Sequence, residues 1–358
     1  MKSNSLEITD NIDCVPKDWD NDSMPSNLTY NYLNSYFTNN SKLIHLFIHN
    51  KSSRFYFNLF KLNFSKATNY SKHWSRFFLR YFEIKMLLLS NSFDSTKNYF
   101  QLNNDLDLKS ILKIIKYKFD VIVLPENLYK SLNTKISLTK VEIEANMILN
   151  INKHWHSIED YLFALKKKYR YKFKKILKST DNLEIRHISK EFIDKNYNLI
   201  QSLLDQVVST SSFNGPKFNV KTFSSLLLKE HIVVRGYFLD ERLVGFSTYS
   251  IKESELHTNY VGFDKNLNFN LPIYARMILD HISTAIEKKS TKLILGRTAN
   301  EFKSNFGAVP ERNFIYIRFT NVFFNTLFNP LIKNIKIKKW NQRRPFKEFT
   351  IQKIEYTR

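Results

Sequence analysis

The sequence predicts an α/β protein with a mixed, mostly antiparallel sheet, built as two domains in tandem. Three observations support this prediction. Three extended runs follow one another over residues 231–263, and a helix with proline in its first turn comes next. A β-branched strand over 291–295 then leads into a short helix that is closed by Gly307. The chain has 358 residues, more than one hydrophobic core usually serves.

The three runs read HIVVRGYFL, LVGFSTYSI and LHTNYVGF, and two short polar links of hairpin length join them, which indicates an antiparallel meander. Asn270 or Leu271 is expected to cap the helix that follows, with Pro272 in its first turn. A last strand is predicted over 313–320.

The N-terminal half carries a similar order of elements. Strands are predicted over 43–50, 54–64, 80–89 and 120–125, with a helix near 108–115. We therefore expect an N-terminal domain (1–152), a connecting basic helix (153–182), a C-terminal catalytic domain (183–322) and a basic extension (323–358).

The connecting helix is predicted as one element over 158–178. Ser157 and Asp160 form an acidic variant of the capping box at its start. Lys166, Arg170, Lys174 and Lys178 recur every four residues, which places a cationic ridge along one helical face. This ridge could hold the phosphates of a donor or of RNA, or it could be a solvated face.

The closing stretch FKSNFGA (302–308) and the order of elements resemble the GNAT acyltransferases, and LGRTANEFKSNFGA is similar to the closing motif of the tandem branch related to Fem peptidoglycan aminoacyltransferases. The resemblance implies tandem GNAT-like domains, each a mostly antiparallel sheet with helices on both faces. It also implies acyl transfer to an amine, with the donor lying between two parallel strands that part, here 256–263 and 291–296. A free backbone amide there would stabilise the oxyanion.

Lys303 is the first catalytic candidate that the resemblance implies. It stands four residues before Gly307, where simple GNAT enzymes carry the tyrosine that protonates the leaving thiolate, and Fem relatives have a lysine in a matching pair. A lysine can neutralise developing negative charge, or act as an acid if burial lowers its pKa. The alternative is one more exposed helix cation.

Glu255 and His257 are candidates for deprotonating the acceptor ammonium, because they lie two positions apart on one face of the central strand. A turn carboxylate and a satisfied strand histidine are the alternatives. The resemblance assigns contacts with an acyl-CoA or acetyl-CoA donor to Tyr260, Val261, Gly262, Lys265, Asn270, Tyr274, Arg297 and Asn300. Packing equally explains Tyr260 and Tyr274, and Arg297 could instead pair with Glu301.

One departure from the family weakens acetyl-CoA as the donor. Simple GNAT enzymes hold the CoA pyrophosphate on a glycine-rich loop before a helix, and residues 264–272 contain no glycine. Amides at the helix start, helped by Lys265, could still bind phosphate.

Composition limits the other classes of function. The net charge is +22, which favours anionic substrates or partners, although abundant Lys, Asn, Ile and Phe also indicate an AT-rich codon bias. The one cysteine, Cys14, excludes an internal disulfide, and no metal site is expected. No apolar run reaches the ~20 residues that span a bilayer. We expect a cytoplasmic protein without integral membrane association.

Three functions remain open. The first is acyl transfer from acyl-CoA to an amine of a small molecule, sugar or peptide. The second is a Fem-type aminoacyltransferase that uses charged tRNA in cell-wall synthesis. The third is a non-catalytic module that binds an anion.

Overall fold

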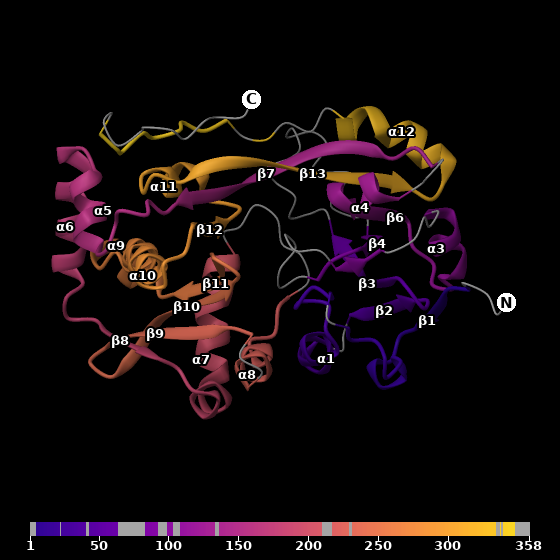
Figure 1. The fold of residues 1–358 in the computed structure, drawn as a ribbon, viewed down its shortest axis with the longest axis horizontal. Helices are drawn as coiled ribbons and strands as arrows, with labels where there is room; N and C mark the ends of the chain where they lie inside the picture. Colours follow the sequence, from indigo (N-terminus) through magenta and orange to yellow (C-terminus); the bar gives the residue numbers. More distant parts are fainter. Residues whose placement is uncertain are drawn as a thin grey trace. The chain divides into compact units, whose positions relative to one another are not determined.

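The computed structural model describes residues 5–21, 23–40, 43–63, 83–91, 99–102, 108–132, 136–209, 217–228, 231–333, 337 and 339–347. The fold is mixed α/β, which confirms the predicted class (Figure 1). The chain forms two compact units. Unit 1 is Met1–Ile143, Ser211–Lys229 and Asn313–Lys338, and unit 2 is Glu144–Thr210, Glu230–Arg312 and Lys339–Arg358.

These units interleave in sequence and so depart from the consecutive domains that we expected. Helix α8 (Lys221–Leu228) belongs to unit 1 because it packs on α1 (Tyr30–Asn39), where Asn40 Nδ2 donates to Thr222 Oγ1 at 2.9 Å. The second half of β13 (Val309–Phe319) also belongs to unit 1, because it pairs antiparallel with β6 (Val121–Pro125).

Unit 1 is a sheet in the order β1-β2-β3-β4-β6-β13, in which only the β4–β6 pairing is parallel. The strands not yet given are β1 (Glu7–Thr9), β2 (Ile44–His49), β3 (Arg54–Asn63), β4 (Glu83–Leu88) and β5 (Phe100–Gln101), which pairs with β3. Residues 80–82 and 64 of the predicted strands lie outside the described residues. The other elements are η1 (Ile12–Cys14), α3 (Leu108–Ile114), α4 (Glu126–Ser131) and α12 (Val322–Lys333).

Unit 2 contains the predicted meander. Its strand order is β7-β12-β11-β10-β9-β8, with β11 and β12 parallel and the other neighbours antiparallel. The strands are β7 (Thr139–Asn150), of which the residues from Glu144 on belong to this unit, β8 (Glu184–His187), β9 (Val233–Leu239), β10 (Arg242–Lys252), β11 (Glu255–Phe263) and β12 (Lys292–Gly296). Strand β7 was not predicted from the sequence, and it pairs with β12 up to the last residue of that strand.

Two helices cover opposite faces of the meander. A Cβ on Gly245 would meet Ile273 and Met277 of α10 (Ile273–Glu287), whereas a Cβ on Gly262 would meet the backbone of α7 (Lys190–Val208). Helix α10 begins one residue later than predicted, because Pro272 is its N-cap. The remaining helices are α9 (Lys265–Asn270) and α11 (Asn300–Ser304).

The predicted connecting helix is wrong as a single element. The capping box of Ser157 and Asp160 is present, but α5 (Ile158–Ala164) has Leu165 as its C-cap, and a second helix, α6 (Lys167–Ser179), follows. Leu165 forms a β-bridge with Phe346, and the Lys166 amide donates to the Pro345 carbonyl at 2.8 Å. Pairing with a segment about 180 residues away extends the backbone here, which helical periodicity cannot foresee.

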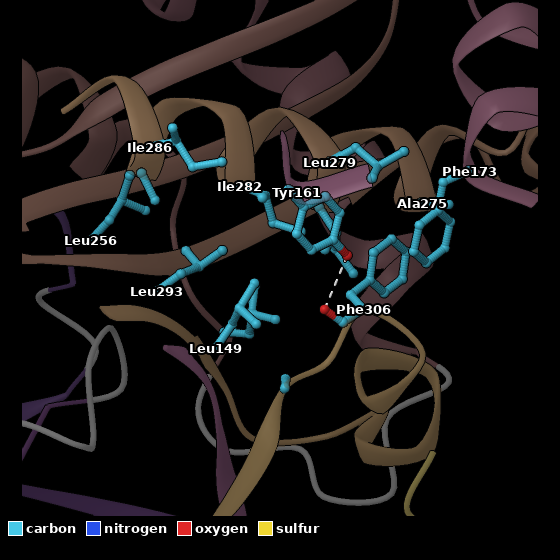
Figure 2. Close-up of a cluster of buried hydrophobic side chains, with 14 of the residues drawn as sticks. Leu149, Tyr161, Phe173, Leu256, Ala275, Leu279, Ile282, Ile286, Leu293 and Phe306 are labelled. Carbon is cyan, nitrogen blue, oxygen red and sulfur yellow. Dashed lines mark hydrogen bonds between the residues drawn. The ribbon is translucent and has the colours of Figure 1, made fainter. Parts of the chain in front are cut away.

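The core of unit 2 anchors the closing motif that follows β12. Phe306 is 1% exposed and stacks on Phe173 of α6 at 4.5 Å between ring centroids. The buried Tyr161 hydroxyl donates to the Phe306 carbonyl at 3.0 Å, as Figure 2 shows. This core fixes the place of α11 and therefore of the residues around Lys303.

Candidate active site at the end of strand β12

The turn after β12 is conformationally unusual. Gly296, Thr298 and Ala299 all have positive φ, at 71°, 68° and 50°. Such angles are uncommon for residues other than glycine, and a β-branched residue such as Thr298 is an outlier there. Backbone strain of this kind costs about 1–3 kcal/mol for each residue, persists only where the surroundings enforce it, and is concentrated at functional sites.

Lys303 holds this turn from inside the protein. Its side chain is 4% exposed, and Nζ donates to the Gly296 carbonyl at 3.2 Å and to the Arg297 carbonyl at 2.7 Å. Burial lowers the pKa of Lys303 to about 7, against an opposing attraction from Glu144, and the charge of Arg297 lowers it further. The alternative of an exposed helix cation is therefore wrong. At neutral pH this amine can give or take a proton.

The pKa of Lys303 makes stability depend on pH. Between its folded value of about 7 and its ordinary value near 10.5, the unfolded chain holds a proton that the folded chain lacks. The contribution of Lys303 to the free energy of unfolding should therefore rise with pH in this window, by up to about 1.4 kcal/mol per pH unit. Below pH 7 both states are protonated, and the burial cost is present in full.

We expect wild type to gain stability relative to Lys303→Met between pH 7 and pH 9. Urea unfolding of both proteins at several pH values measures this difference. A difference that stays constant from pH 6.5 to pH 9 would contradict the lowered pKa of Lys303.

The strands beside β12 part from it near the same point. Its parallel register with β11 runs from Glu255–Lys292 to His257–Ile294, and β11 then continues to Phe263. On the other edge of β11, Asn259 and Tyr260 together oppose Thr248 of β10, which is a β-bulge. A bulge bends the strand that carries it, so it explains why β11 leaves β12 here.

The β7 side is also irregular, because Gly296 pairs with Met147 one residue out of register with Ile294 and Ile148. Asn146 precedes Met147, so it lies beside the end of β12. Among the buried side-chain atoms without a hydrogen-bond partner in the described residues, three lie on elements that meet here: Asn146 Oδ1 on β7, Asn259 Nδ2 on β11 and Asn300 Oδ1 on α11. Buried amides normally have hydrogen-bond partners, and one without a partner calls for an explanation such as a catalytic role or a bound water or ion.

Asn300 was predicted from the sequence as a contact of the acyl donor, whereas Asn146, Asn259 and Glu144 were not predicted as site residues. The bulge at Asn259 and the pairing of β7 have no local sequence signal. The alternation of apolar residues in TKVEIEANMILN could have revealed β7 itself.

Glu255 and His257, the two residues predicted to act as the general base, lie toward the start of β12, away from Gly296. Glu255 Oε2 is 3.4 Å from His257 Nε2, and Glu255 Oε1 is 3.0 Å from Lys292 Nζ. Lys292 starts β12 and Gly296 ends it, so Glu255 and Gly296 are separated by about 13 Å along the strand direction. The structure therefore brings Glu255 and His257 together, but not with Lys303.

The three residues of β11 that were predicted to contact the acyl donor mostly make contacts within the protein. The Tyr260 amide donates to Thr248 Oγ1 at 2.8 Å, so this amide is not available to an oxyanion. Val261 packs against the core cluster that contains Ile273, and Gly262 is covered closely by α7. Packing explains Val261 and Gly262 without a ligand.

The helix starts that could have bound phosphate are also occupied. Gln206 Oε1 accepts from the Lys265 amide, and the Asp264 carboxylate accepts from the next two amides of α9. At the start of α10, Asn268 Oδ1 accepts from the Tyr274 amide at 2.9 Å. Asn270 is exposed at the end of α9. The first turns of both helices therefore already carry their own anionic or amide caps.

Tyr274 has a packing role. Its ring stacks between Phe263, at 5.6 Å between centroids, and Phe302, at 5.2 Å. Burial raises the pKa of its hydroxyl well above the ordinary range. Because Phe302 precedes Lys303, this stack positions the helix that carries the lysine.

The C-terminal segment, residues 339–347, also holds α11. Glu301 forms its ion pair with Arg343 of this segment, and the Arg343 amide donates to Ser304 Oγ at 3.1 Å. A Cβ on Gly307 would overlap the ring of Phe346, and Gly307 has a φ of 89°. Glu301, which was weighed from the sequence as a partner of Arg297, therefore has Arg343 of this segment as a partner.

Two surface hollows lie elsewhere in unit 2. One of about 470 Å³ is lined by β8, β9 and α10, including Arg235 and Asp280, and one of about 640 Å³ lies on α6. Lys303 lines neither of them. The candidate site is therefore defined by strand geometry and buried polar groups rather than by either hollow.

No helix in the described part of the chain is both long and apolar enough to cross a membrane. Within those same residues, no group of three or more His, Cys, Asp or Glu side chains is placed to hold a metal ion.

No family model and no curated protein matches this chain. Solved structures similar to it include a conserved protein of unknown function from Bacteroides thetaiotaomicron, at 12% identity, 81% coverage of this chain, 90% of that chain and a TM-score of 0.48. FemX is 11% identical, with 80% of this chain and 90% of that chain covered and a TM-score of 0.47. A probable N-acyltransferase from Enterococcus faecalis is 12% identical, with 81% of this chain and 65% of that chain covered and a TM-score of 0.43. At these values the likeness says nothing about substrates.

Proposed function

We propose that this protein transfers an acyl group from an activated donor to an amine, with Lys303 as the residue that serves the leaving group. The observation that carries the proposal is a buried lysine with a pKa of about 7 at the point where β11 leaves β12. Parting parallel strands can take an extended donor arm between them. The strained turn beside them and the unpartnered amides support a ligand at this place.

The reaction has a definite proton balance. The amine nitrogen attacks the acyl carbon, a C–N bond forms, and the bond to the thiolate or alkoxide leaving group breaks. The acceptor nitrogen loses a proton, and the leaving group gains one. The Lys303 ammonium can donate that proton and recover it from solvent, because its pKa lies near neutrality. His257, with Glu255, remains a proposed base for the acceptor, about 7 Å along the strands from Gly296.

Acyl-CoA is the first donor to test, and aminoacyl-tRNA is the second. Side-chain oxygens of the protein already accept from the amides at the starts of α9 and α10, so these amides are not available to a CoA diphosphate. This favours aminoacyl-tRNA as the donor. The acceptor is proposed to be an amine of a small molecule, sugar or peptide.

The test is an acyl-transfer assay with the full chain. A panel of acyl-CoAs with mixed amines is followed by thiol release, and labelled aminoacyl-tRNAs are followed by loss of the label from the tRNA. Transfer from either donor that depends on Lys303 supports the proposal. Binding of both donors without transfer would leave a non-catalytic anion-binding module and would overturn it.

A further inference from the structure

Helix α6 presents an exceptional concentration of positive charge. Its thirteen residues, KKYRYKFKKILKS, include seven cations and no acid. We define the α6 surface as the outward side chains Lys167, Lys168, Arg170, Tyr171, Lys174, Lys175 and Lys178. None of its cations forms an ion pair with a carboxylate in the part of the chain that the structure describes.

The orientation of this surface is fixed by the core. Phe173 and Ile176 are buried and hold the opposite side of α6 in place. At 100° per residue, Lys167, Tyr171, Lys174 and Lys178 then fall on one outward stripe. The stripe extends about 16 Å from Lys167 to Lys178, at 1.5 Å per residue.

This arrangement is unfavourable for the isolated protein. The pairs Arg170–Lys174 and Lys174–Lys178 place like charges four residues apart, which destabilises a helix. Lys167 and Lys168 also lie at the helix N-terminus, where the macrodipole disfavours cations. The pKa of Lys172 is lowered by burial and then by Lys168 and Arg343, which shows the same crowding. A bound polyanion would relieve all of these repulsions.

Aromatic rings are interleaved with the cations. Tyr171 is 72% exposed and, with Lys167, Lys168, Arg170 and Lys174, lines the hollow of about 640 Å³. Phe163 of α5 is 69% exposed, with Lys347 Nζ 4.0 Å and Arg170 Cζ 5.9 Å from its ring centroid. Cations that follow a backbone and exposed rings on which bases stack are the two components of single-strand binding surfaces.

Other anionic partners fit less well. A helix that adsorbs to a bilayer turns its apolar face outward, whereas the apolar face of α6 is buried in the protein. A stripe of about 16 Å is also longer than one diphosphate, so it suits a strand that presents several phosphates in a row.

We propose that the α6 surface binds the phosphate backbone of a single-stranded nucleic acid segment, with Tyr171 as a stacking platform. This binding does not depend on the proposed acyl transfer. Each phosphate contact adds a salt-dependent increment to the logarithm of the affinity, with a slope near −0.7 per contact for single strands.

The test uses the full chain and fluorescent 20-mers of poly(U) and poly(dT), titrated at several salt concentrations. The triple variant Lys167→Gln, Lys174→Gln and Lys178→Gln is expected to bind about 100-fold more weakly at 0.1 M salt, with the salt slope reduced by about 2. The matched control replaces three exposed lysines elsewhere in unit 2, Lys195, Lys288 and Lys289, with glutamine. It carries the same net charge and should bind at close to the wild-type affinity.

Tyr171 separates stacking from charge. Tyr171→Ala should lose about 5- to 100-fold in affinity with the salt slope unchanged, and Tyr171→Phe should restore binding. Circular dichroism establishes that each variant is folded. Equal losses in the α6 variant and its control would overturn the proposal, as would binding of the wild type to phosphatidylglycerol vesicles but to neither oligonucleotide. Tighter binding of poly(U) would indicate that the bound strand is RNA, and tighter binding of poly(dT) would indicate DNA.

Discussion

Lys303→Ala is expected to slow acyl transfer by about 10²- to 10⁴-fold, the range for loss of a positioned acid or base. The variant removes the ammonium that bonds the carbonyls of Gly296 and Arg297, so both the proton donor and the clamp on the strained turn are lost. Initial rates of thiol release or tRNA deacylation measure the effect. Lys288→Ala, an exposed cation on the same unit, is the matched control and should retain full activity.

The pH profile distinguishes the proton donor from a purely structural clamp. If the protonated form of Lys303 serves the leaving group, transfer should fall as the pH rises through about 7, because the ammonium fraction falls there. Lys303→Arg keeps the charge and the donors but does not titrate in this range. It should therefore lose the descending limb near pH 7 while keeping part of the activity. A wild-type limb that persists unchanged in Lys303→Arg would assign that limb to another group.

Phe306→Ala is expected to have the largest effect on stability, a loss of about 3–5 kcal/mol in the free energy of unfolding, as for other buried phenylalanines. The side chain is 1% exposed and packs between Phe173 and Phe302. Its removal leaves a cavity beneath the closing motif and loosens α11. Urea unfolding followed by circular dichroism measures the loss.

The matched control for this variant is Phe269→Ala in α9, because Phe269 is 91% exposed. The same chemical change there should alter the free energy of unfolding by no more than about 0.5 kcal/mol. Equal losses at the two positions would mean that Phe306 does not carry the packing described here. Activity of Phe306→Ala at a temperature where it remains folded would also report whether α11 must be held rigidly.

Several elements followed from local sequence. The meander of β9, β10 and β11 was predictable because apolar runs of strand length alternate with links of hairpin length, and α10 because its apolar positions recur with helical period. The capping box at Ser157 was equally readable, since it needs only two side chains three residues apart. In each case the forces that select the structure act between residues close together in the chain.

The site followed from the sequence only in part. The motif around Lys303 and the parallel neighbours β11 and β12 were foreseen, but local sequence did not show that Glu255 lies beside Lys292 at the start of β12, away from Lys303. Strand direction decides this, because residues at the two ends of one strand are about 13 Å apart even when they are close in sequence. The break between α5 and α6 also had no local cause, because it comes from the β-bridge between Leu165 and Phe346, which are far apart in the sequence.

The sequence by itself therefore determined the β9–β11 meander, helix α10, the capping box at Ser157 and the place of Lys303 before Gly307. Only the tertiary structure decided that Lys303 is buried, that its pKa lies near 7, and that Asn146 and Asn259 flank the end of β12. The physical reason is that propensity and periodicity are properties of neighbouring residues. Desolvation, strand register and bulges depend instead on segments that meet only after the chain has folded.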